Sequence, residues 1–179
     1  NVYTAKEDEM IKAVGFYATG KNTSYEIYYL DEFEGVESFA KKRYIQSGML
    51  ANKGFYTIDL EDEFQVKSGE KFAVIVKLTT PDTVHPVAIE YRAGTSTSSV
   101  VLDDGEGYIS LFGKSWEHVE ESKACNLCLK VYSTNMAKEG WKIILNKSTI
   151  KNNTILCLMM ILLLWIEIFN CEIGICALL

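Results

Sequence analysis

The strongest constraint on the fold is the run Lys-Phe-Ala-Val-Ile-Val-Lys-Leu-Thr-Thr at residues 71–80. β-Branched and aromatic side chains of this kind favour a pleated strand. The run belongs to a series of short alternating apolar segments that extends over residues 10–133. Alternation with a period of two places one set of side chains on each face of a sheet, whereas a helix needs a period near 3.6. The series therefore predicts an antiparallel β-sheet protein with residues 71–80 in the middle of a sheet.

Turn-forming residues separate the segments of this series at intervals of about 8 to 15 residues. That spacing indicates an all-β protein, and we expect an antiparallel β-sandwich or jelly-roll-like fold of about eight or nine strands. Gly113-Lys114-Ser115 lies between two such segments and predicts a hairpin. The charged residues 32–42 leave room for one helical turn. The other predicted strands are residues 10–18, 24–30, 54–60, 64–66, 87–91, 108–112, 116–119 and 127–132, and residues 43–50 are strand or loop.

The composition changes abruptly after residue 135. Residues 136–179 contain no Asp, Arg, Pro or Gln and are dominated by Ile, Leu, Asn and Lys. We therefore expect a β-sandwich domain at residues 1–135 and an unrelated apolar tail at residues 136–179. Three interpretations of the tail stay open: read-through or frameshifted sequence, a membrane anchor, and a buried helix. Its unbroken apolar run, residues 155–165, is shorter than the roughly 20 residues that a membrane-spanning helix needs.

The formal net charge of −6 argues against a nucleic-acid partner, because phosphate binding needs clustered Lys and Arg. The basic cluster Lys41-Lys42-Arg43 follows an acidic stretch that largely cancels its charge.

The first residues, Asn1 to Glu9, are polar, and they lack the apolar core of a signal peptide and an initiator Met. We therefore expect a piece of a longer protein. A membrane is expected as a partner only if the tail is genuine.

No arrangement typical of a catalytic site is present in the sequence. A papain-type site needs a Cys beside a His, and the local signature of that Cys is absent. The spacing of His118 and Cys128 is best explained by chance. Cys125-x-x-Cys128 lies in a predicted strand, where side chains three positions apart face opposite ways. We therefore expect Cys128 in the core and Cys125 at a strand end or on the surface. No catalytic residue, metal site or cofactor is expected, and the chain is not predicted to be an enzyme.

Aromatic side chains are the candidates for ligand binding, because an aromatic face packs on the C–H face of a sugar ring. Tyr28, Tyr108 and Trp116 are the candidate ligand-binding residues. Tyr28 and Tyr29 point to opposite faces of one strand, so at least one of them meets solvent or a neighbouring element. Packing in the core is the alternative for each of these aromatic residues.

A family pattern extends over several of the predicted strands. Its segments are Glu9-Met-Ile-Lys-Ala-Val-Gly-Phe-Tyr-Ala18, Ser24-Tyr-Glu-Ile-Tyr28, Ser47-Gly-Met-Leu50, Gly54-Phe-Tyr-Thr-Ile-Asp-Leu60, Gly69-Glu-Lys-Phe-Ala-Val-Ile-Val-Lys-Leu78, Pro86-Val-Ala-Ile-Glu90 and Leu127-Cys-Leu-Lys130. With these segments the chain resembles the lectin-like domain found C-terminal to papain-family cysteine peptidases of clostridia, other gut anaerobes and methanogens. The similarity covers about residues 1–134 and stops at the tail. Phe112 stands where similar sequences often have Asp, so we expect this hairpin to lack a polar turn contact, which weakens the case for a ligand role of the hairpin.

The resemblance implies a β-sandwich accessory domain of a secreted or surface peptidase, with an extracellular or cell-surface location. The catalytic Cys and His of the family lie in an upstream domain. The first hypothesis is therefore a non-catalytic domain of a larger papain-type cysteine peptidase, which binds or positions a substrate or a cell-surface ligand. Its partners would be the upstream peptidase domain and a glycan or protein ligand. The alternative is a stand-alone carbohydrate-binding or adhesion module, tethered to a membrane if the tail is genuine.

Overall fold

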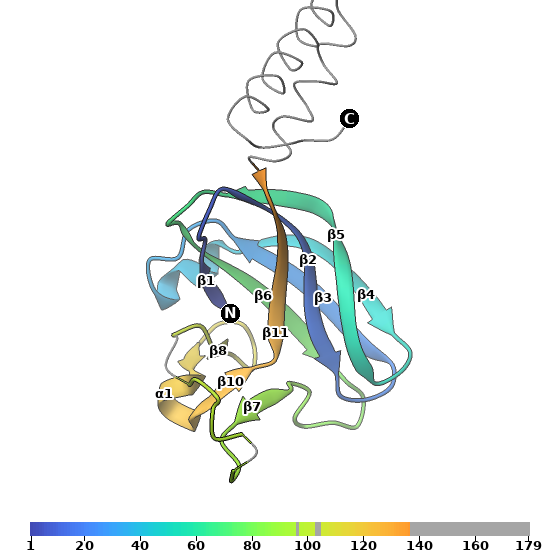
Figure 1. Cartoon of the computed structure of the whole chain (residues 1–179). Helices are drawn as coiled ribbons and strands as arrows, with labels where there is room; N and C mark the ends of the chain where they lie inside the picture. Colours follow the sequence, from blue (N-terminus) through green and yellow to red (C-terminus); the bar gives the residue numbers. More distant parts are fainter. Residues whose placement is uncertain (96, 103–104, 137–179) are drawn as a thin grey trace, which may run out of the picture. The chain divides into compact units, whose positions relative to one another are not determined.

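Figure 1 shows the structure, a computed structural model that describes residues 1–95, 97–102 and 105–136. The apolar tail and its three interpretations lie outside the described residues, and the domain boundary at residue 135 stays a prediction. In the described part of the chain, no helix is long and apolar enough to cross a bilayer. The elements in chain order are β1 (Val2–Thr4), β2 (Glu9–Ala18), β3 (Thr23–Leu30), the 3-10 helix η1 (Val36–Lys41), β4 (Arg43–Leu50), β5 (Gly54–Val66), β6 (Lys71–Thr79), β7 (Ile89–Tyr91), β8 (Tyr108–Ile109), β9 (Glu117–His118), α1 (Val119–Lys123), β10 (Cys125–Leu127) and β11 (Leu129–Asn135).

Two antiparallel sheets form the two layers of the domain. The first sheet has the order β1-β6-β3-β4, and the second has the order β11-β2-β5. In Figure 1 the second sheet lies in front of the first, and the short ribbons β7–β10 and β8–β9 lie at one end of the two layers. The prediction of an all-β antiparallel sandwich is confirmed. Strand β6 lies between β1 and β3, which is the central position expected for residues 71–80.

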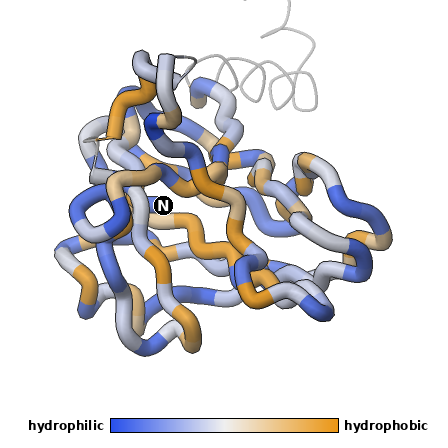
Figure 2. The backbone as a smooth tube through the Cα atoms, turned by 90° about the horizontal axis from the view of Figure 1, so that it is seen from below, coloured by the Kyte–Doolittle hydropathy of each residue, from blue (hydrophilic) through white to orange (hydrophobic). Residues whose placement is uncertain are grey.

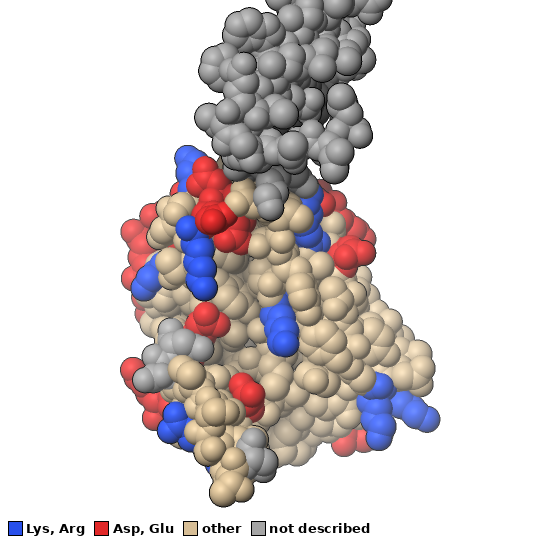
Figure 3. Space-filling model, viewed as in Figure 1, with Lys and Arg blue, Asp and Glu red and all other residues tan. Residues whose placement is uncertain are grey.

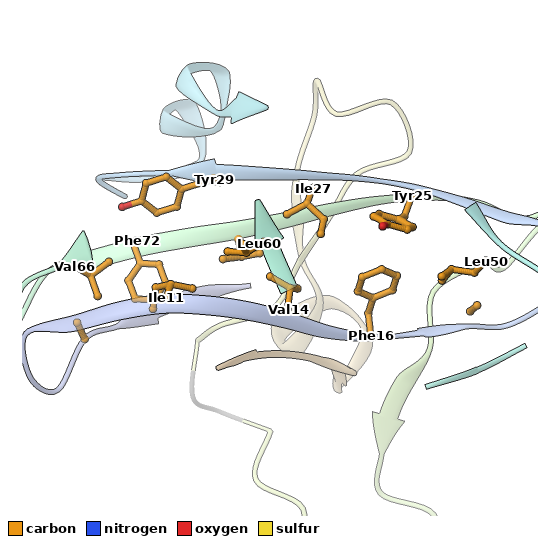
Figure 4. Close-up of a cluster of buried hydrophobic side chains, with 13 residues drawn as sticks. Ile11, Val14, Phe16, Tyr25, Ile27, Tyr29, Leu50, Leu60, Val66 and Phe72 are labelled. Atoms are coloured by element: carbon orange, nitrogen blue, oxygen red, sulfur yellow. The ribbon is translucent and has the colours of Figure 1, made fainter. Parts of the chain in front are cut away.

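The main hydrophobic core fills the space between the two sheets (Figure 4). It is built from alternate side chains of the middle strands, so the period that predicts the strands is also the period that forms the core. Along the chain, hydrophobic segments alternate with hydrophilic turns (Figure 2). Each buried apolar side chain stabilises the fold by about 1.5–3 kcal/mol relative to leaving it in water. Strand β2 contributes Ile11, Val14 and Phe16 to this core, and β3 contributes Tyr25, Ile27 and Tyr29.

An irregularity in β5 explains why the sequence predicts two strands where the structure has one. The register between β2 and β5 shifts after Ile11, which pairs with Phe64, whereas Ala13 pairs with Asp59. The acidic residues of β5 between these two pairs are exposed to solvent. Lys12 forms an ion pair with Glu63 across the irregularity, with an Nζ–Oε2 distance of 2.6 Å. A β-bulge therefore interrupts the alternation of the sequence without ending the strand.

Gln46 connects the edges of the two sheets. Its side chain is 7 % exposed. Its Nε2 donates a hydrogen bond to the Asp59 carbonyl oxygen at 3.1 Å, and its Oε1 accepts one from the Glu61 amide at 2.8 Å. Both polar atoms of a buried amide are thereby satisfied, as burial requires. Strand β4 of the first sheet is joined in this way to β5 of the second.

The largest departure from the predicted strands is the segment after Trp116. The predicted hairpin is confirmed, because Tyr108 pairs with His118 in antiparallel order. Its strands are shorter than expected, however, and helix α1 begins at Val119, where strand was predicted. Ala124 ends this helix in the left-handed conformation, with φ of 51°. A single helical turn is too short to show a helical period in the sequence.

Candidate functional site

The three candidate aromatic residues surround one small hydrophobic cluster on the outer face of the first sheet. We call this side of the molecule the covered face. Tyr28, Tyr108 and Trp116 are partly buried against the cluster. The buried members are Val2, Leu30, Phe39, Ala73 and Ile75. The structure therefore brings residues from β3 and from the β8–β9 hairpin together, although they are far apart in the sequence.

Phe39 of η1 lies at the centre of the covered face. Its side chain is 1 % exposed. Its ring centroid is 4.3 Å from that of Trp116, 5.4 Å from that of Tyr108 and 5.2 Å from that of Phe33. The ring of Tyr108 also stacks on that of His118, with the two centroids 4.8 Å apart. These contacts indicate that Tyr108 and Trp116 serve packing, and a ligand-binding role for them stays an untested prediction.

Tyr28 lies at the edge of the covered face. Its hydroxyl donates a hydrogen bond to Glu26, which also pairs with Lys77 at an Nζ–Oε1 distance of 2.5 Å. The hydrogen bond to Glu26 is the main reason that the pKa of Tyr28 is raised to about 12. Its ring meets Tyr44 edge-on, with centroids 5.8 Å apart. Tyr29 faces the opposite way into the core, as the alternation predicts. A ligand-binding role for Tyr28 likewise stays a prediction.

A buried carboxylate holds the segment that leads into the hairpin. Glu120 is 8 % exposed. Its carboxylate accepts hydrogen bonds from the backbone amides of Gly105, Glu106 and Gly107 at 2.6, 2.8 and 2.8 Å. Several backbone N–H groups around one carboxylate satisfy a charge that burial would otherwise destabilise. Glu120 therefore anchors the segment that leads into the hairpin, and no pattern in the sequence indicates this role.

The two cysteines depart from their predicted positions. Cys125 is buried, 3 % exposed, and Cys128 is only partly buried, so the prediction had them reversed. The cause is that the strand is not continuous: β10 ends at Leu127 and β11 begins at Leu129. Burial is the main cause that raises the pKa of both thiols, which disfavours the reactive thiolate form.

The neighbours of His118 are not those of a papain-type imidazole. The nearest charged groups to its ring are the carboxylates of Glu120 and Glu121, at 3.8 and 3.4 Å. Its ring stacks on Tyr108. Among the described residues, no group of three or more His, Cys, Asp or Glu side chains is placed to hold a metal ion.

The outer face of the second sheet carries exposed aromatic rings instead. We call it the open face. Tyr17, Phe55 and Tyr132 are 43 %, 40 % and 40 % exposed. The rings of Tyr17 and Phe55 meet at 5.0 Å with an interplanar angle of 64°, and we call this pair the aromatic corner. Figure 3 shows the side of the molecule that carries β11, β2 and β5: acidic and basic side chains gather toward its upper end, whereas the surface below them is mostly uncharged around a basic side chain.

Gly15 determines how closely the rings of the open face approach β2. A Cβ atom at this position would lie 2.7 Å from Phe55 Cζ and 3.0 Å from Tyr132 Cε2. The rings therefore occupy the space that any side chain would need. A glycine inside a strand often marks such a close approach, and this was the one available signal in the sequence for the open face. It was not used in selecting the candidate residues.

A pocket of about 410 Å³ opens beside the aromatic corner. This volume is within the range of about 300–1,000 Å³ for small-ligand sites. Tyr17 and Phe55 line it together with the polar residues Glu90, Asn126 and Lys130. The Asn126 Nδ2 donates to the Val101 carbonyl oxygen at 2.7 Å, while its Oδ1 is buried with no hydrogen-bond partner in the described structure. Such an acceptor points to a bound water or to a donor on a ligand.

The two packed antiparallel sheets and the two short ribbons define an all-β sandwich domain. A family model described as a lectin-like domain matches residues 1–133. The chain belongs to this lectin-like domain family. A comparison with curated proteins finds no match.

A solved structure has the same fold. It contains the cysteine protease and lectin-like domains of Cwp84, a surface-layer-associated protein of Clostridium difficile. The similarity has a TM-score of 0.60 at 20 % sequence identity and covers 75 % of this chain. It covers 31 % of the Cwp84 chain, in the lectin-like domain that follows the cysteine protease domain. The chain therefore spans about a third of the length of the Cwp84 chain that it matches.

Proposed function

We propose that the chain is the non-catalytic accessory module of a larger papain-type cysteine peptidase, and that it holds the peptidase on a substrate or a cell-surface ligand. The observation that carries the proposal is the shared fold with a lectin-like domain that follows a cysteine protease in a surface-layer-associated protein. The match of the lectin-like family model to residues 1–133 supports it independently. An extracellular or cell-surface location is part of the proposal.

The chemistry of the described residues agrees with a binding role rather than a catalytic one. The pKa values of the thiols of Cys125 and Cys128 are raised by burial, which is the opposite of what a nucleophilic thiol needs. His118 is packed against Tyr108 and two carboxylates. The open face, in contrast, displays apolar surface beside a pocket, which is a common mark of a binding site.

The test has two arms. The first is to sequence the gene on both sides of this chain: an upstream segment in the same frame that encodes a Cys-Gly-Ser-Cys-Trp-like motif is expected. The same reads across codon 135 decide whether the tail is genuine.

In the second arm, the parent peptidase is made with and without residues 1–135. Both forms should cleave a small soluble peptide equally, and only the complete form should remain on washed cells. A parent without a peptidase domain, or equal retention of both forms, contradicts the proposal.

The second candidate is a stand-alone carbohydrate-binding or adhesion module. The observation that favours it is the pocket beside the aromatic corner, because a binding site on the module itself does not require a catalytic neighbour. An intact gene with no peptidase domain in frame would select this candidate over the first.

A further inference from the structure

We propose that the pocket beside the aromatic corner binds a neutral oligosaccharide, with one pyranose ring stacked against Tyr17 and Phe55. The inference rests on the proposed ligand-binding function and adds a site and a ligand class to it. Neither residue was among the candidates selected from the sequence. The argument combines the geometry of the rings, the charge of the pocket and the polar groups that line it.

The aromatic corner has the geometry of a stacking site. Tyr17 and Phe55 are paired residues on neighbouring strands, and their rings meet at 64°. An edge-on contact leaves a face of one ring free, and both side chains remain about two-fifths exposed, 43 % and 40 %. The C–H face of a pyranose is apolar and packs on such a ring as other apolar groups do. Two rings at an angle contact a sugar from two sides.

The corner is held in place before any ligand arrives. Phe55 and Tyr132 lie directly over Gly15, where even a methyl group would collide with them. Tyr17 and Phe55 also restrict each other through their ring contact. Side chains that are already ordered lose less conformational entropy on binding, which favours affinity. A flexible surface tyrosine would lack this advantage.

Polar side chains complete the pocket. Glu90 of β7 and Lys130 of β11 both line it and are exposed. In the structure as described, neither forms an ion pair. A carboxylate accepts hydrogen bonds and an ammonium group donates them, and sugar hydroxyls do both. The combination of one apolar corner with separate acceptors and donors fits a polyhydroxylated ring better than a purely apolar ligand.

The charge of the pocket selects against acidic sugars. Its lining contains three carboxylates, those of Glu90, Glu106 and Glu120, against the ammonium group of Lys130 and the terminal amino group of Asn1, whose pKa is lowered to about 5 by burial. The carboxylate of Glu120 is already satisfied by three backbone amides. An anionic ligand would meet a net negative lining, and like charges at short range are unfavourable. Neutral hexoses and N-acetylhexosamines are therefore the expected class.

The experiment is a titration of the full chain, labelled with ¹⁵N, followed by amide chemical shifts. The probes are cellohexaose, chitohexaose and mannohexaose, with trigalacturonic acid as the acidic comparison. At least one neutral probe should give saturable shifts in β2, β5, β10 and β11, and the acidic probe should give none. Tyr17→Ala should weaken binding about tenfold, as expected for loss of one stacking contact of about 1.4 kcal/mol. Tyr44→Ala removes the same side chain from an exposed site on the other sheet and should leave the affinity unchanged.

Four results overturn the inference. They are no saturable binding of any neutral probe, equal affinities of the Tyr17→Ala and Tyr44→Ala proteins, saturable binding of the acidic probe, and shifts centred on Tyr108 and Trp116. If any of these is found while the complete parent peptidase is still retained on cells, the proposed sugar site is wrong and the proposed accessory function stands. If retention on cells also fails, the sugar site and the accessory function are both wrong.

Discussion

The two outer faces of the sandwich use the same kind of residue in opposite ways. On the covered face, Tyr108 and Trp116 pack around the buried ring of Phe39. On the open face, Tyr17 and Phe55 contact each other and remain exposed. The difference lies in what passes over each sheet: η1 and the β8–β9 hairpin contribute rings to the covered face. An aromatic residue in a strand is thus available to a ligand only where no distant segment of the chain covers it.

The largest expected effect is the loss of the central ring on the covered face. Phe39→Ala should lower the free energy of unfolding by about 3–5 kcal/mol, because the fully buried ring leaves a cavity. Phe55→Ala, on the open face, should cost about 1 kcal/mol or less, because its ring is partly in water already. Urea denaturation of both variants measures the difference. Equal losses would mean that the two faces are not covered and open as described.

The second prediction tests what holds the β8–β9 hairpin, which covers this face, in place. Glu120→Ala leaves the amides of Gly105, Glu106 and Gly107, of which that of Gly107 is buried, without their acceptor and should cost about 2–3 kcal/mol. Glu120→Gln keeps one acceptor oxygen and should cost less. Hydrogen exchange at these three amides should accelerate in both variants, and more in the alanine form. Unchanged exchange would show that the carboxylate does not anchor this segment.

A smaller effect is expected from adding one methyl group to the open face. Gly15→Ala retains every aromatic side chain but forces the rings of Phe55 and Tyr132 to move, at a cost of about 1–2 kcal/mol. The chemical shifts of both rings should change, while those of Phe39 and Trp116 stay constant. An alanine that leaves all four rings unchanged would contradict the close approach over β2.

The smallest effect is a dependence on pH at the edge of the covered face. The hydrogen bond from Lys77, and then that from Tyr28, lowers the pKa of Glu26 below its ordinary value of 4.5. A lowered folded-state pKa contributes stability above the unfolded-state value, and this is lost as the pH falls through the folded-state value. Glu26→Gln should therefore be slightly less stable than the native chain at pH 7, and the difference should vanish as the pH falls through the lowered folded-state pKa of Glu26. A stability difference that persists in acid would exclude ionisation as the cause.

Much of the fold follows from local patterns in the sequence. The two-residue period of β2, β3 and β6 predicts both the strands and the side chains that fill the core, because the period and the burial have the same cause. The hairpin follows from Gly113-Lys114-Ser115. The bulged middle of β5 and the single turn of α1 do not follow, because the first interrupts the period and the second is too short to show one.

The candidate site was less predictable than the fold. Tyr108 and Trp116 are separated from Phe39 by many residues, so the sequence does not indicate that η1 buries them. Tyr17 and Phe55 are neighbours only through the register of β2 and β5, which depends on the bulge after Ile11. Which aromatic rings are exposed is thus a property of strand pairing, and the sequence alone does not specify it.

The amide of Gln46 has a consequence for association between molecules. Exposed strand edges are templates on which a strand of another molecule can pair, and this is a common route to aggregation. On β5, the carbonyl of Asp59 and the amide of Glu61 already bond to a side chain of the same molecule. A foreign strand could pair along this stretch only by displacing Gln46 from a buried position. The hydrogen bonds that Gln46 makes between the two sheets therefore also protect this edge of β5 from pairing with a strand of another molecule.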